Sequence, residues 1–280
     1  MGTGVSATAP DYQHFHSFER IHAMATDANS LDFTERLLGR HRGSAAPLLT
    51  WYGEPGERVE LSGHVFDNWV AKSANLLAEE FDAGPGTRVL IELPAHWKSL
   101  AIGFAVLATG AEIIVPAAGM AGLPQAAPGH DGGAPADAGT SPDLVVTGEP
   151  VAAAEAFPQA EIVAVALGSL ALSFSGDLPS GALDYAGEVR GFGDYYLADP
   201  VPAAGPALTA ADGSAGLRYA QLFGLEAGEG TALLGPGVDF AVALHAAVSQ
   251  WRGSSPLVLL GDGAAVTQRI LDDERVVRRP

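Results

Sequence analysis

Apolar residues fall into short runs and helix-spaced stretches, and the clearest case is residues 85–116. An apolar run at residues 88–93 is typical of a buried strand. Apolar residues then recur every three or four positions over residues 97–108 and predict a helix. Gly110 ends it, because glycine tolerates the left-handed conformation of a helix end. A second apolar run at residues 112–116 completes two parallel strands joined by a right-handed helical crossover.

The stretch before this unit predicts a hairpin and two helices. Residues 48–52 and 58–61 are strand-like and flank a turn that contains glycine and proline. Ser62 follows, and serine is a favourable helix N-cap. Apolar residues then recur about twice per turn and predict a helix up to Phe81. A short amphipathic helix is expected at residues 31–41.

Two further strand–helix–strand patterns follow the first unit. They occupy residues 144–165 and 232–260, and a final helix is expected near residues 264–273. Residues 176–206 are rich in Gly, Pro, Asp and Tyr and are expected to be irregular. Three such units predict an α/β fold with a mainly parallel sheet or sheets and helices on both faces.

Composition suggests where the chain divides. Residues 1–30 lack periodicity and are expected to form a flexible tail. We expect an α/β subdomain at residues 31–206, with an insertion rich in Gly, Pro and Ala at residues 117–142. Residues 207–280 are expected to form a second α/β subdomain or a continuation of the same domain.

The overall composition narrows the class of protein. The chain has 280 residues, of which 48% are hydrophobic, enough for a large packed core. No run of 18 apolar residues predicts a membrane span, and the N-terminus lacks the pattern of a signal peptide. Cysteine is absent, which excludes disulfides, thiolate metal sites and a cysteine nucleophile. These features favour a cytoplasmic protein.

The chain is strongly acidic. Its formal net charge is −18, so nucleic acid and anionic lipid are not expected as partners. A homo-oligomer or a partner protein remains open. The sequence contains only two lysines, Lys72 and Lys98. Any chemistry that needs a lysine must use one of them.

Several stretches match a known family pattern in the same order along the chain. They are Val59-Glu-Leu-Ser62, Gly84-Pro-Gly-Thr-Arg-Val89, Glu92-Leu-Pro94, Leu107-Ala-Thr-Gly-Ala111 and Ile114-Val-Pro116. This text resembles the N-terminal part of the adenylate-forming superfamily, which includes acyl-CoA synthetases, nonribosomal peptide adenylation domains and luciferases. The match covers about residues 45–116 and extends more loosely to the C-terminus. The resemblance implies the fold of the N-terminal subdomains of acyl-CoA synthetases.

The resemblance also implies where a nucleotide would bind. The family has a loop rich in Ser, Thr and Gly whose backbone amides surround the phosphates of ATP. The candidate here is the segment 212–219, and its matching residues are Gly213, Ser214, Gly216 and Arg218. These four are the candidate binding residues for ATP or AMP.

This loop departs from the family pattern in its charges. Arg218 stands where the family has proline, and Tyr219 stands where it has lysine. Asp212 adds a negative charge beside the place of a polyphosphate. At about 4 Å and an effective dielectric constant near 20, two like charges repel by roughly 4 kcal/mol, which opposes ATP binding. An ordinary surface turn explains the same residues.

The resemblance leaves two hypotheses for function. The family's acyl pocket and catalytic lysine come later in the chain than Pro280, so we expect a truncated, degenerate pseudoenzyme. The first hypothesis is a non-catalytic binding or interaction protein. The alternative is a weak nucleotide or acyl-adenylate binder, or part of an AMP-forming acyl or aryl ligase that needs a partner chain. We predict no catalytic residue and no metal site.

Strand ends offer two other candidate ligand positions. His96 and Trp97 begin a helix after a strand, where α/β folds often bind ligands. A helix-start role for His96 and a core role for Trp97 also explain them. Asp262 lies between two glycines as a loop carboxylate, and a turn that caps the last helix explains it with fewer assumptions.

Overall fold

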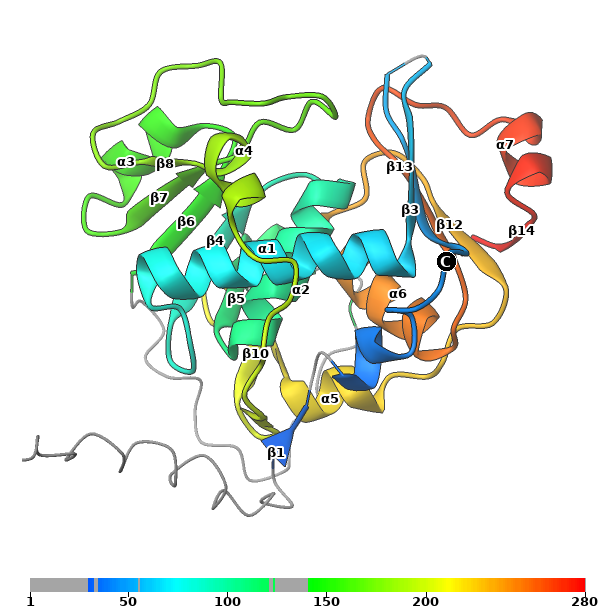
Figure 1. Cartoon of the computed structure of the whole chain (residues 1–280), viewed down its shortest axis with the longest axis horizontal. Helices are drawn as coiled ribbons and strands as arrows, with labels where there is room; N and C mark the ends of the chain where they lie inside the picture. Colours follow the sequence, from blue (N-terminus) through cyan, green and yellow to red (C-terminus); the bar gives the residue numbers. More distant parts are fainter. Residues whose placement is uncertain (1–29, 33–34, 55, 121–122, 124–140, 280) are drawn as a thin grey trace, which may run out of the picture.

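Two mainly parallel sheets flank a layer of helices in the computed structural model, which describes residues 30–32, 35–54, 56–120, 123 and 141–279 (Figure 1). The seven-stranded sheet runs, in spatial order, β11 (Gly216–Arg218), β10 (Pro206–Ala210), β5 (Glu112–Val115), β4 (Arg88–Glu92), β6 (Leu144–Thr147), β7 (Glu161–Ala164) and β8 (Leu183–Asp184). The five-stranded sheet runs β14 (Val276–Arg278), β12 (Thr231–Leu234), β13 (Leu257–Leu260), β2 (Pro47–Tyr52) and β3 (Arg58–Ser62). Within these two sheets only β10–β11 and β2–β3 are antiparallel pairs.

The predicted crossover unit at residues 85–116 is confirmed. β4 and β5 are parallel, and α2 (Trp97–Thr109) joins them and ends at Gly110 with a φ of 86°. The predicted apolar face of this helix is too narrow, however, because every residue of α2 is buried. A helix that is covered on all sides belongs in the middle of a protein, and α2 lies between the two sheets.

Alternating residues of β4 show that the seven-stranded sheet is covered on both faces. Val89 and Ile91 pack into the central core, whereas Leu90 packs on the opposite face with Ala153 of α3 (Pro150–Ala156). Successive side chains of a strand point to opposite faces of the sheet, so a strand that is apolar throughout must be packed against other elements on both faces. The predicted α/β class with helices on both faces is therefore confirmed.

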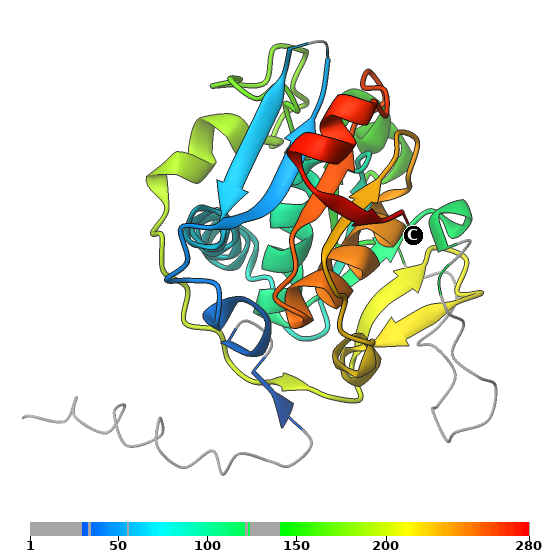
Figure 2. The same ribbon diagram turned by 90° about the vertical axis from the view of Figure 1, so that its right-hand side faces the viewer.

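The five-stranded sheet has the same construction. Leu257 and Leu259 of β13 face the central core, which contains α6 (Phe240–Arg252), and Val258 faces outward. The short helix α7 (Gln268–Asp273) covers the outer face (Figure 2). Both sheets are thus buried on two sides, as parallel sheets require.

Three aromatic residues hold the helix layer together. Trp251 of α6 lies 4.7 Å, between ring centroids, from Phe66 of α1 (Gly63–Phe81) and 4.7 Å from Phe104 of α2. Trp251 is fully buried, and its indole N–H donates to the carbonyl of Leu48 at 3.3 Å. These contacts link helices α1, α2 and α6 to strand β2 of the five-stranded sheet.

The N-terminal hairpin is part of a sheet that is otherwise formed by the C-terminal residues. β2 and β3 pair as predicted, and β2 lies parallel to β13 with Leu49 opposite Leu257. Glu274 strengthens this long-range connection, because its Oε1 atom accepts from the hydroxyl of Tyr52 at 2.6 Å and from Arg58 at 2.8 Å.

Two local predictions need correction. The expected helix at residues 31–41 is only a single π-helical turn, Glu35–Gly39, which buries Leu37 and Leu38. The segment 176–206 is not wholly irregular, because it also contains α4 (Tyr185–Glu188), the 3₁₀ turn Val189–Gly191 and β9 (Val201–Pro202), which pairs with β1 (Ser30–Leu31). Tyr185 is buried there and its hydroxyl lies 2.7 Å from the hydroxyl of Ser73, which anchors the segment on α1.

The predicted tail and insertion lie largely outside the described residues. Within the expected insertion 117–142, the described part includes a 3₁₀ turn at Ala117–Met120 and the buried Leu123. The division of the chain at residue 206 stays a prediction. β10 and β11 follow that position and join the same sheet as β4 and β5.

Candidate functional site

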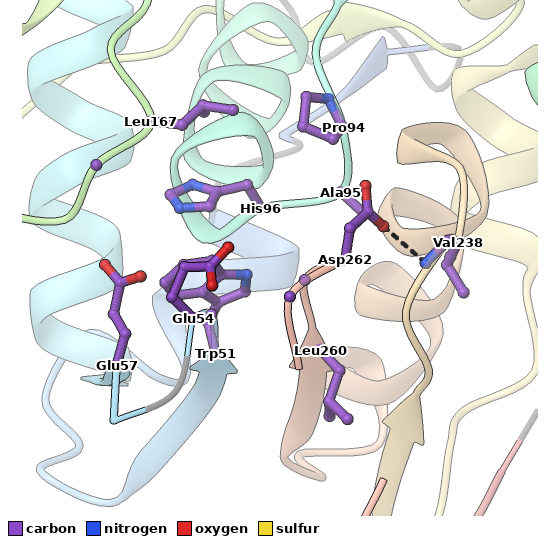
Figure 3. A pocket seen from close by; sticks show the side chains of 15 residues that line it. Trp51, Glu54, Glu57, Pro94, Ala95, His96, Leu167, Val238, Leu260 and Asp262 are labelled. Atoms are coloured by element: carbon purple, nitrogen blue, oxygen red, sulfur yellow. Dashed lines mark hydrogen bonds between the residues drawn. The ribbon is translucent and has the colours of Figure 1, made fainter. Parts of the chain in front are cut away.

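A cavity of about 300 Å³ lies where the carboxyl ends of the two sheets face each other (Figure 3). Five parallel strands, β2, β4, β7, β12 and β13, end at its wall. The lining residues that closely follow these strands include Gly53, Pro94, Leu167, Gly237 and Gly261. Ligands of open α/β sheets bind beyond the carboxyl ends of the strands. Two such edges around one cavity make it the best candidate site.

His96 is the most informative residue of this cavity. It is 3% exposed, and its Nδ1 atom accepts the backbone N–H of Lys98 at 3.0 Å as the N-cap of α2. A ring nitrogen that accepts carries no proton, so the neutral ring carries its proton on Nε2. That Nε2 atom has no hydrogen-bond partner among the described residues. Burial, aided by the charge of Lys98, lowers the pKa of His96 to about 3, so a neutral imidazole lines the cavity.

Trp51 provides an aromatic wall beside His96. The two ring centroids are 4.2 Å apart in an edge-to-face arrangement. A Cβ atom on Gly53 would collide with the indole, and one on Gly261 would lie 3.2 Å from Cζ2. The indole Nε1 also has no hydrogen-bond partner among the described residues. The two glycines therefore leave room for the indole, which lines the cavity and has a second buried donor without a partner.

Three carboxylates line the mouth of the cavity. Glu54 and Glu57 point toward the His96 ring, and Asp262 lies across from them (Figure 3). Glu57 accepts the hydroxyl of Ser169 at 2.5 Å, and Asp262 accepts the N–H of Gly237 at 3.0 Å. Among the described residues, the lining contains no lysine or arginine. The mouth of the cavity is therefore negative.

Lys98 supports one wall from behind. Its ammonium group donates to the carbonyls of Ala166 and Gly168, both at 2.7 Å, and so holds the loop after β7. Burial, together with the charge of Arg190, lowers the pKa of Lys98 to about 8, although Glu57 opposes this shift. Lys98 thus fixes the position of Leu167 and acts as a structural cation.

The predicted phosphate loop forms the tight turn between β10 and β11. Gly213 donates its N–H to Ala210 at 2.8 Å and has a φ of 70°. Ser214 donates its N–H to the side chain of Asp212 at 2.9 Å, and hydrogen bonds from Ser214 lower the pKa of Asp212. Two amides of the turn are therefore used within the turn itself.

Arg218, the predicted cation of this loop, also has partners inside the fold. Its guanidinium donates to the carbonyl of Ala204, and its N–H donates to the side chain of Gln221 at 2.6 Å. Gly216 opens β11 and is exposed. The cavity lining includes none of Gly213, Ser214, Gly216 and Arg218. Nucleotide binding by these residues stays a prediction.

The sequence anticipated this site only in part. His96 is a helix-start residue as expected, and Trp97 is a core residue at 4% exposure. The prediction that the turn at Asp262 caps the last helix is wrong, because Thr267 is the N-cap of α7 and accepts the N–H of Ile270. Asp262 instead lines the cavity.

Three site residues were missed altogether: Trp51, Glu54 and Glu57 lie in a predicted hairpin, and nothing in the sequence marks them as functional. Their signal is positional, since Glu54 and Glu57 follow the carboxyl end of β2. Their place at the site can be recognised only once β2 is known to lie parallel to β13.

Comparison with solved structures identifies the fold. An acyl-CoA synthetase from Brucella canis superposes with a TM-score of 0.66 and 16% sequence identity, over 89% of this chain and 47% of that chain. The acetoacetyl-CoA synthetase of Streptomyces lividans superposes with a TM-score of 0.59 and 17% identity, over 83% of this chain and 38% of that one. This is an acyl-CoA synthetase-like fold. The expected likeness to the N-terminal part of the adenylate-forming superfamily is confirmed at the level of fold.

In sequence, the chain is similar to a mycobacterial protein. It is 36% identical over 167 residues to the TIGR03089 family protein of Mycobacterium tuberculosis (strain ATCC 25618 / H37Rv). The match covers 58% of this chain and 59% of that protein, so the chain spans well under two thirds of the proteins it resembles. No protein-family model matches the chain.

Two further properties of the described chain bear on partners. None of its helices combines the length and the hydrophobicity that crossing a bilayer requires. In the same residues, no three His, Asp or Glu side chains are grouped so as to hold a metal ion.

Proposed function

We propose that this chain is a small-molecule-binding protein built on an acyl-CoA synthetase-like scaffold, and that it does not itself activate a carboxylic acid with ATP. The observation that carries the proposal is the Nε2–H group of His96. A buried donor without a partner is costly, so a cavity that contains one is suited to a ligand that completes the hydrogen bond. The cavity itself is shaped by the ends of five strands.

The lysines support the non-catalytic part of the proposal. Activation of an acid by ATP produces a negatively charged transition state that needs nearby cations. Lys72 donates to the carbonyl of Phe192 at 2.5 Å, and Lys98 donates to two carbonyls of the loop after β7. Both lysines therefore have structural roles, and Tyr219 occupies the loop position where the resemblance expects a third.

The alternative is a nucleotide or acyl-adenylate binder, or a partial ligase that acts with a partner chain. The superposition on acyl-CoA synthetases favours it. Arg218 is the cation that such a site would use, and Ser214 would contribute its hydroxyl. Against it stand the negative charge of Asp212 and the amides of Gly213 and Ser214 that are already used within the turn.

Calorimetry and a turnover assay test this proposal. The full chain is titrated with ATP, with AMP and with a non-hydrolysable acyl-adenylate analogue, and pyrophosphate release is followed with a panel of carboxylic acids. We expect flat titrations and no release of pyrophosphate. Micromolar binding of ATP that is lost in Arg218→Ala, or pyrophosphate release that depends on an acid, would establish the alternative.

A further inference from the structure

We infer that the cavity takes a small organic cation, a protonated amine on a flat or short apolar body that also carries a hydrogen-bond acceptor. This inference rests on the proposed small-molecule-binding function and specifies its ligand. Three independent properties of the cavity lead to it: the charge of its mouth, the aromatic wall and the buried donor.

The charge of the lining selects the sign of the ligand. Glu54, Glu57 and Asp262 all line the cavity, whereas no lysine or arginine of the described part of the chain does. Lys98 lies behind the wall, and its ammonium group is bound to the carbonyls of Ala166 and Gly168. The three carboxylates attract a cation that enters and repel an anion, and the single charge of Lys98, which interacts with Glu57, offsets only part of this field.

The wall favours an organic cation over a small hydrated ion. Trp51 is the best side chain for a cation–π contact, and the glycines at positions 53 and 261 leave room for its ring. Leu167 and Val238 add apolar surface to the lining. An amine with an attached ring or short alkyl chain matches both the carboxylates and this apolar surface.

The imidazole of His96 adds a requirement for an acceptor. His96 lines the cavity and is 3% exposed, and its buried Nε2 atom has no hydrogen-bond partner among the described residues. The centroid of the ring lies 4.2 Å from that of the Trp51 ring, so an acceptor bonded to Nε2 would lie near the indole. A carbonyl, hydroxyl or ether oxygen near the amine satisfies both contacts.

A fragment screen matched for charge tests the inference. Each skeleton is offered as the amine, the alcohol and the carboxylate, for example benzylamine, benzyl alcohol and benzoate. Binding to the full chain is read from the indole N–H signal of Trp51, which is assigned by comparison with Trp51→Phe. We expect the hits to be amines, and we expect their binding to weaken as salt is added.

Substitutions at the mouth connect this binding to the carboxylates. The double variant Glu54→Gln and Glu57→Gln should bind the best amine at least tenfold more weakly. Glu155→Gln, an exposed position on α3 outside the lining, is the matched control and should bind as the natural chain does. Thermal unfolding of all variants confirms that each is folded.

Gly263→Ala provides a variant that keeps the charge unchanged. A Cβ atom there would lie 2.6 Å from the Oε1 atom of Glu54, which is the end of a flexible side chain and can move. We expect amine binding to weaken while the unfolding temperature stays nearly constant. This result would separate the position of the carboxylate from the stability of the fold.

The outcomes separate the ligand class from the function. Hits that are mainly carboxylates, or hits spread equally over the three classes, would overturn the cation and leave small-molecule binding intact. If no fragment of any class shifts the Trp51 signal, both the cation and the proposed cavity function are wrong. Amine binding that survives the double substitution would also overturn the inference, because the carboxylates would then not select the ligand.

Discussion

The Nδ1 atom of His96 accepts the backbone N–H of Lys98 at 3.0 Å, so a single bond fixes both the start of α2 and the tautomer of the imidazole. The bond leaves Nε2 as the protonated atom of a ring that lines the cavity. The same residue thus has a structural role and a proposed binding role. Suitable substitutions separate the two.

His96→Ala removes both roles, and His96→Asn retains the cap. We expect His96→Ala to lower the free energy of unfolding by about 1 kcal/mol through loss of the N-cap. His96→Asn should be closer to the natural chain, because an asparagine oxygen accepts the same N–H. Both variants should lose ligand binding, since neither supplies the Nε2–H donor. Urea denaturation measures the stability, and equal losses in the two variants would contradict the capping role.

The pH dependence of stability reports the buried imidazole. In the unfolded chain His96 has an ordinary pKa of about 6.5, whereas in the folded chain the pKa is about 3. Between these values the unfolded state binds a proton and the folded state does not, so stability falls as the pH falls through this window. The slope is at most about 1.4 kcal/mol per pH unit.

His96→Asn serves as the reference for this measurement. The carboxylates and His245, whose pKa burial also lowers, are present in both proteins and cancel in the comparison. The natural chain should lose more stability than the variant between pH 6.5 and pH 4. If urea titrations gave the natural chain and the variant the same dependence of stability on pH, the pKa of His96 would be the same in the folded and unfolded states, and the prediction would be wrong.

Lys98→Met should loosen the wall of the cavity. The substitution removes two hydrogen bonds to the loop after β7, so amide hydrogen exchange in residues 166–170 should become at least tenfold faster. Lys72→Met is the matched control, because it removes the bond to Phe192 in another loop and should affect residues 190–194 instead. Exchange that changes equally in both loops would indicate general destabilisation.

Gly103→Ala should destabilise the helix layer, although alanine is the better helix former. A Cβ atom at this position would lie 2.7 Å from the ring of Phe240, where α2 meets α6. Overpacking costs about 1–3 kcal/mol, which exceeds the gain of about 1 kcal/mol in helix propensity. Gly224→Ala is the control, since nothing lies within 4 Å of its Cβ position. Thermal unfolding should rank the control at or above the natural chain and Gly103→Ala below it.

The parts of the fold that were predictable are those with local causes. The unit β4–α2–β5 follows from two apolar runs, a helical spacing and the glycine at position 110, all within about thirty residues. Ser62 is the N-cap of α1 as expected and accepts the N–H of Val65. These features depend on residues that are close in sequence, so they can be predicted from a local sequence pattern.

The site depends on a contact that no local pattern contains. Trp51 and Glu54 reach the cavity because β2 lies parallel to β13, whose residues come more than two hundred positions later. The sequence favours a helix cap at Asp262 because it does not show that Gly237 lies beside this residue. The full burial of α2 has the same origin, since α1 and the much later α6 cover the face that the helical spacing leaves open.

The order of strands in the five-stranded sheet also constrains how the protein is made. Leu48 leaves the ribosome 203 residues ahead of Trp251, the side chain that donates to its carbonyl. Until β13 emerges, the early hairpin has an open edge on β2, and unpaired edges of nascent chains are prone to aggregate. A circular permutant in which β13 comes next to the hairpin in sequence should therefore fold faster, because the pairing of β2 with β13 would become local.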